Sequence, residues 1–205
     1  MEIKTIKLLG GIGVLLAILS TIPAGGFVFG LTGLVLVFIA MLELSKKTNN
    51  KKIYDNFFVS FILSIVGSVL GGIALVSTFI LREIRFFRNG SFYWNYFDRD
   101  MGFSPKEPFL MQRKWDTFNN LSVGAIVAIV IFALVIYGIL VARAYFLKKS
   151  YEEVAKETQV EYFKTSGNFI FIGSILSILL VGFIVYFIGY IFEIVAFFSL
   201  KEDLN

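Results

Sequence analysis

The chain has 205 residues, of which 57% are apolar and 17% are charged, and its formal net charge is +4 at pH 7. Soluble globular proteins have about 45–50% apolar and about 25% charged residues, so this composition excludes an ordinary soluble domain. Cysteine and histidine are both absent, which excludes disulfides, thiolate zinc sites, cysteine catalysis and the usual general base. We therefore expect an integral membrane protein that is not an enzyme and needs no cofactor.

The first long apolar run, residues 8–42, contains no charged residue. One helix of this length would measure about 52 Å, whereas the hydrocarbon core of a bilayer is about 30 Å thick. The run is interrupted at Pro23-Ala24-Gly25-Gly26, where proline and paired glycines favour a tight turn. The sequence therefore predicts a helical hairpin, with helices at about residues 5–22 and 27–45, that either spans the bilayer or is re-entrant.

Three further apolar segments follow, and the last is long enough to be split near Val181-Gly182. The remaining predicted helices lie at about residues 56–81, 118–147, 165–181 and 183–200. An aromatic-rich outer loop (82–116) and a cytoplasmic segment (148–164) lie between them. The predicted fold is a single all-α membrane domain, a polytopic bundle of six transmembrane or re-entrant helices in the order hairpin, helix, outer loop, helix, hairpin. The alternative is five spans, with one long kinked final helix.

The two predicted hairpins also resemble each other. Sliding residues 8–45 by 156 positions onto residues 164–201 needs no gap and matches seven of thirty-eight residues. Three of the matches are glycine pairs, namely Gly11 with Gly167, Gly26 with Gly182, and Gly33 with Gly189. Internal repeats are common in membrane transporters, but apolar composition alone could nearly produce this score. A true repeat and a chance similarity both stay open.

The lysines and arginines indicate the orientation. With six spans, twelve of the nineteen basic residues fall on the side of the termini, and seven fall in the outer loop. The positive-inside rule then favours a cell-membrane protein with both termini in the cytoplasm.

Several short motifs at both ends of the chain resemble those of a known family. The motifs are KLLGGIG at 7–13, GLVLV at 33–37, IYDN at 53–56, IVG at 65–67, GY at 189–190 and AFFSL at 196–200. In these motifs the chain resembles an archaeal family of small integral membrane proteins catalogued as domain of unknown function 996. The likeness covers about half of the chain and omits the outer loop. It implies a membrane location and an archaeal source, but no activity and no functional residues.

Glu193 is the one charge inside the last apolar run, about 10 Å of helix before Lys201. An ionisable group at this depth costs about 2.5–3.5 kcal/mol on insertion scales, so it needs a partner or water. Arg143 is at comparable depth in the fourth predicted helix. A buried Arg143–Glu193 pair is the structural interpretation, and a proton or cation site is the functional one.

Two further sets of residues are candidates for contacts rather than chemistry. Arginines and aromatic residues of the outer loop suit lipid headgroups or another membrane or envelope protein; they are Arg82, Arg85, Arg88, Trp94, Tyr96 and Trp115. Glycines at four-residue spacing suit close helix packing, within one bundle or in an oligomer; they are Gly26, Gly30, Gly67 and Gly71. The basic residues form no patch for nucleic acid.

Two functions follow from these features. The first hypothesis is a non-catalytic structural or partner-interacting membrane subunit that uses the outer loop. The second is a small ion or proton-coupled transporter or channel that uses Glu193.

Overall fold

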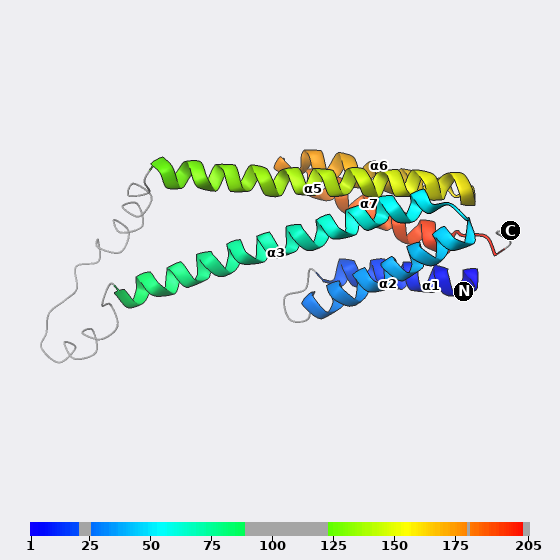
Figure 1. Ribbon diagram of the computed structural model, residues 1–205, viewed down its shortest axis with the longest axis horizontal. Coiled ribbons are helices and arrows are strands. Elements are labelled where there is room, and N and C mark those ends of the chain that lie inside the picture. Colours follow the sequence, from blue (N-terminus) through cyan, green and yellow to red (C-terminus); the bar gives the residue numbers. More distant parts are fainter. Residues whose placement is uncertain (21–25, 89–122, 180, 203–205) are drawn as a thin grey trace, which may run out of the picture. The chain divides into compact units, whose positions relative to one another are not determined.

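The computed structural model describes residues 1–20, 26–88, 123–179 and 181–202, and the regular elements in these ranges are helices (Figure 1). They are α1 (Ile3–Leu19), α2 (Gly26–Lys47), α3 (Lys51–Arg88), α5 (Val123–Thr158), α6 (Glu161–Ile175), the 3-10 turn η2 (Leu176–Ile178) and α7 (Val181–Phe198). The all-helical fold and the order of six helices are thus confirmed. The last apolar run forms two helices, so the single kinked final helix of the alternative is wrong.

Within the described ranges, four helices are long and apolar enough to cross a membrane, namely α2, α3, α5 and α7. Their most apolar stretches have mean hydropathies between 2.2 and 2.7. The other two are shorter, because α1 has 17 residues and α6 has 15. Many residues of these apolar helices are valine and isoleucine, which are not strong helix formers in water. In an apolar medium a helix is nevertheless favoured, because it satisfies every backbone hydrogen bond internally.

The chain divides into two compact units. The second unit, residues 68–137, consists in the described ranges of the end of α3 and the beginning of α5. Its described side chains are mostly apolar and exposed; Ile73 and Leu134, for example, are 56% and 61% exposed. A soluble domain rarely exposes apolar surface on this scale, and such a surface suits lipid.

The first unit, residues 1–67 and 138–205, contains both hairpins and the core. Helices α1 and α2 form one hairpin, α6 and α7 form the other, and α1 packs against α7. The contact is close, since a Cβ atom on Gly10 would overlap the ring of Phe197. Helix α1 begins and α7 ends at the same end of this unit (Figure 1).

The two hairpins have equivalent geometry at the predicted offset of 156 positions. Helix α1 ends at Leu19 and α6 ends at Ile175, the residue 156 positions later. A Cβ atom on Gly26 would meet the carbonyl oxygen of Ser20, and one on Gly182 would meet the carbonyl oxygen of Leu176. Glycine is therefore needed at the same place in both hairpins. This shared geometry supports a repeat more strongly than the sequence identity does.

Helix α3 begins five residues earlier than predicted. The Oδ1 atom of Asn50 accepts a hydrogen bond of 3.0 Å from the backbone N–H of Lys52. This is the bond of a helix N-cap, so the helix starts directly after Asn50 rather than at the predicted residue 56. The amide of Asn50 also donates to Glu157, at 2.8 Å, and thereby ties the turn between α2 and α3 to the end of α5.

Helix α5 continues eleven residues past its predicted end at Leu147. The extension buries Tyr151, Val154 and Ala155, and Ser150 donates a hydrogen bond of 2.7 Å to the carbonyl oxygen of Ile53. Most of the predicted cytoplasmic segment is therefore helical and packed. The helix ends before Gln159, whose φ of 58° is left-handed and typical of a residue just past a helix.

Candidate functional site

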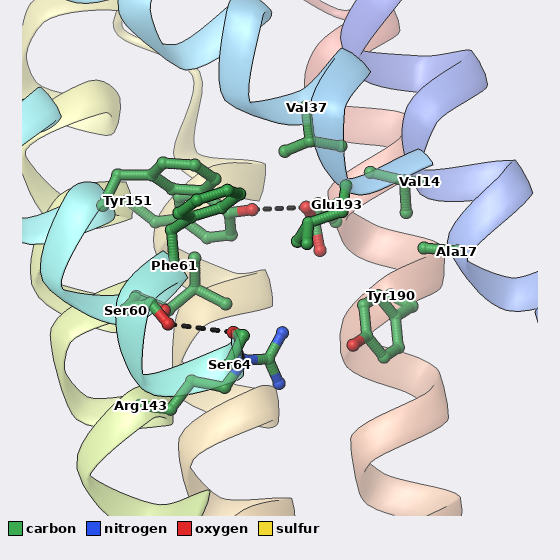
Figure 2. A pocket seen from close by; sticks show the side chains of 13 residues that line it. Val14, Ala17, Val37, Ser60, Phe61, Ser64, Arg143, Tyr151, Tyr190 and Glu193 are labelled. Atoms are coloured by element: carbon green, nitrogen blue, oxygen red, sulfur yellow. Dashed lines mark hydrogen bonds between the residues drawn. The ribbon is translucent and has the colours of Figure 1, made fainter. Parts of the chain in front are cut away.

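A cavity of about 50 Å³ with a partly polar lining lies within the first unit, between helices of both hairpins and the adjoining parts of α3 and α5 (Figure 2). Its apolar lining comes mainly from the first hairpin and α3. Its polar lining is Ser60 and Ser64 of α3, Arg143 and Tyr151 of α5, and Tyr190 and Glu193 of α7. A water molecule needs about 10–15 Å³ of such space, so the cavity has room for about three to five.

Glu193 is the most deeply buried charged side chain of this lining, with 3% of its surface exposed. The hydroxyl of Tyr151 donates a hydrogen bond to its Oε1 atom (Figure 2). Its other oxygen, Oε2, is buried and has no hydrogen-bond partner in the part of the chain that the structure describes. A buried carboxylate oxygen without a partner is costly, so this atom has an unmet need for a proton, a water molecule or a ligand.

Arg143 is held in place by two hydrogen bonds. Its Nε atom donates to the Oγ atom of Ser64 at 2.6 Å, and its Nη1 atom donates to the hydroxyl of Tyr186. Ser64 in turn donates to the carbonyl oxygen of Ser60 at 2.9 Å. Tyr190 packs edge-on against Tyr186, with ring centroids 5.2 Å apart. A guanidinium has five N–H donors, so Arg143 retains donors beyond these two bonds.

Arg143 and Glu193 line the same cavity, but they are not among the ion pairs found within the described ranges. Arg143 is hydrogen-bonded to Ser64 and Tyr186. Glu193 is hydrogen-bonded to Tyr151. The direct pair considered from the sequence is therefore replaced by two separately held charges that face a shared space. This arrangement leaves room for a third group between them.

The two sides of the cavity occupy equivalent positions of the repeat. Leu34 and Val37 of α2 line it from the first hairpin, and the residues 156 positions later are Tyr190 and Glu193 of α7. The cavity thus lies where the two hairpins face each other, and only the second hairpin supplies polar groups. Binding sites at repeat interfaces are typical of secondary transporters.

Comparison with known proteins identifies the family. The model of a family described as protein of unknown function (DUF996) matches residues 29–191, which is more than half of the chain. The chain belongs to this family. It is also similar to the uncharacterized protein MJ1644 of Methanocaldococcus jannaschii, with 31% identity over all of this chain and 97% of that protein. No solved structure matches it.

The other predicted contact residues of this DUF996 chain have different outcomes. Arg82, Arg85 and Arg88 belong to the end of α3, which continues past the predicted boundary at Leu81 because no proline or glycine occurs in residues 82–88. The predicted outer-loop surface of Trp94, Tyr96 and Trp115 lies outside the described residues.

The four predicted packing glycines do not behave alike. Gly26 and Gly30 lie against Ser20 at the end of α1, where a Cβ atom on Gly30 would be 3.1 Å from Ser20 Cβ. A Cβ atom on Gly67 would make an ordinary contact of 3.4 Å with Ile139. At Gly71 a Cβ atom would meet nothing within 4 Å, so only the first pair is a tight contact.

Sequence reasoning missed the tyrosines as site residues. Tyr186, Tyr190 and Glu193 follow one another at spacings of four and three residues, so they share one face of α7. Arg143 and Tyr151, eight residues apart, share one face of α5. These spacings were the available signal, but aromatic residues are so common in this chain that the pattern did not stand out. In the described ranges no cluster of His, Cys, Asp or Glu could hold a metal ion.

Proposed function

We propose that this chain is a multi-pass integral membrane protein whose cavity is the site of a small proton-coupled transporter. The observation that carries the proposal is Glu193 Oε2, a buried carboxylate oxygen without a partner that borders a cavity. Ionisable groups inside membrane helices are costly and typically mark ion pathways or proton relays. The position of the cavity between two equivalent hairpins also supports alternating access by movement of one hairpin against the other.

The competing proposal is a non-catalytic subunit that acts through partners or lipid. It depends mainly on residues 82–116, most of which lie outside the described ranges, and no described contact favours it over transport. Neither proposal requires catalysis, because the polar groups of the cavity are suited to binding and proton exchange. For both proposals we expect a cell-membrane location with cytoplasmic termini.

The test is proton movement across a membrane that contains only this protein. Purified chain is reconstituted into vesicles loaded with a pH-sensitive dye, in potassium chloride with a potassium ionophore, and a pH gradient is imposed. We expect the intact protein to dissipate the gradient faster than empty vesicles. The variant Glu193→Gln should lose this activity, because a glutamine side chain has no exchangeable carboxyl proton.

The matched control is Glu43→Gln. Glu43 is a carboxylate at the end of α2, where it pairs with Lys46 at 2.7 Å and with the N-terminal amine at 3.3 Å, away from the cavity lining. This variant should dissipate the gradient like the intact protein. Equal rates for the intact protein and the Glu193→Gln variant, or no activity above empty vesicles, would contradict the proposal.

A further inference from the structure

The charges around the cavity balance only in one protonation state. Among the described residues that line it, Arg143 is the only cation and Glu193 is the only carboxylate. A guanidinium stays protonated in proteins, and an isolated buried charge is strongly unfavourable. The lining is therefore neutral when Glu193 is ionised. When Glu193 takes up a proton, Arg143 is left without a counter-charge.

No other described residue of the lining can supply that counter-charge, and α6, which packs against α7, contributes no residue to the lining. Helix α5 faces it with Tyr151 and Arg143, and α7 adds Tyr190. Helices α1, α2 and α3 contribute only uncharged side chains to the lining, namely Val14, Ala17, Leu34, Val37, Phe57, Ser60, Phe61 and Ser64. A negative group that replaces ionised Glu193 must therefore come from outside the protein.

We infer that the cavity binds a small monovalent anion together with a proton, with Arg143 holding the anion and Glu193 Oε2 carrying the proton. This inference rests on the proposed proton-coupled transport and names its substrate class. One proton and one anion enter together, so the net charge of the cavity is unchanged. The only covalent change is the O–H bond formed at Oε2.

The hydrogen bonds already present suit this state. Oε1 of Glu193 continues to accept from the hydroxyl of Tyr151. Once Oε2 carries the proton, its O–H donates a hydrogen bond to the anion. The unused donors of Arg143 bind the same anion from the other side. The oxygen that has no partner in the described chain therefore acquires one only when both ligands are bound.

The size of the cavity limits the anion. About 50 Å³ holds about three to five water molecules, so the ligand has at most about that many non-hydrogen atoms. Chloride, nitrate and formate meet this limit. Amino acids and sugars are too large without an opening of the helices.

The test is anion binding to the full chain in lipid nanodiscs, measured by calorimetry with chloride, nitrate and formate over a pH series. For the intact protein we expect affinity to rise as the pH falls, by up to about tenfold per pH unit, because each anion takes up one proton. Titrations in buffers of different ionisation enthalpy measure that proton directly. Glu43→Gln should behave like the intact protein.

Two variants separate the roles. Glu193→Gln is uncharged at every pH, so it should bind the same anions with no pH dependence. Arg143→Gln should lose anion binding. Because Glu193→Gln is expected to retain binding, a folding defect cannot imitate the supporting result.

Four outcomes would overturn the inference. The first is that neither the intact protein nor Glu193→Gln binds an anion, which would mean that water alone fills the cavity. The second is an unchanged pH dependence of binding in Glu193→Gln, and the third is undiminished binding in a folded Arg143→Gln variant. The fourth is binding of sodium or ammonium that Glu193→Gln abolishes. Proton movement in vesicles without anion binding would remove only this inference. Anion binding without proton movement would instead contradict proton-coupled transport and leave a binding site.

Discussion

The contact between α6 and α7 at Gly173 links the packing of the second hairpin to the cavity, and we expect Gly173→Ala to disturb both. A Cβ atom there would lie 2.6 Å from the backbone nitrogen of Tyr186 and 2.8 Å from its Cα atom. An ordinary contact begins at 3.4 Å, so the helices must separate by about 0.8 Å. Backbone atoms cannot rotate away as a flexible side chain can, and overpacking of this kind costs about 1–3 kcal/mol.

The measurement is the free energy of unfolding in mixed micelles, followed by circular dichroism. The matched control is Gly71→Ala, because a Cβ atom at Gly71 meets nothing within 4 Å and alanine is the better helix former by about 1 kcal/mol. We expect Gly173→Ala to lower the free energy of unfolding and Gly71→Ala to leave it unchanged or raise it. Equal effects of the two substitutions would refute the argument from helix contact.

Two other substitutions test individual interactions. Tyr151→Phe removes the hydroxyl that donates to Glu193 and should lower the free energy of unfolding by about 1–3 kcal/mol, because both carboxylate oxygens are then unpaired. The control is Tyr145→Phe, at a side chain that is 40% exposed. Equal effects of the two substitutions would contradict this argument. Gln159→Gly should raise the free energy of unfolding by about 1 kcal/mol, since Gln159 has a left-handed φ of 58° that is unfavourable for a residue with a Cβ atom. A free energy of unfolding lower in Gln159→Gly than in Gln159→Ala would contradict the argument.

The architecture was predictable because each of its causes is local. Long uncharged runs, a Pro/Gly turn and the distribution of lysines predict helices, hairpins and their order without knowledge of any tertiary contact. Helix ends were less predictable, since they depend on single bonds. Asn50 caps α3 five residues before its predicted start, and α5 continues because the face with Tyr151 is buried.

The candidate site was predictable only in part. Glu193 and Arg143 stood out because a charge in an apolar run is conspicuous, and both do line the cavity. Their partners could not be deduced, because each comes from another helix. Arg143 of α5 bonds Ser64 of α3 and Tyr186 of α7, and Glu193 of α7 bonds Tyr151 of α5. Which oxygen of Glu193 lacks a partner depends on side-chain positions that no sequence pattern encodes.

The most direct test of the central claim is whether Glu193 exchanges a proton inside the bilayer. Infrared difference spectra of the protein in lipid are recorded across a pH series, and the carboxyl C=O stretch is followed in the intact protein, Glu193→Gln and Glu43→Gln. The account predicts a pH-dependent carboxyl band that is lost in Glu193→Gln, is retained in Glu43→Gln and shifts in deuterated water. A spectrum in which Glu193→Gln removes no titrating band would contradict it.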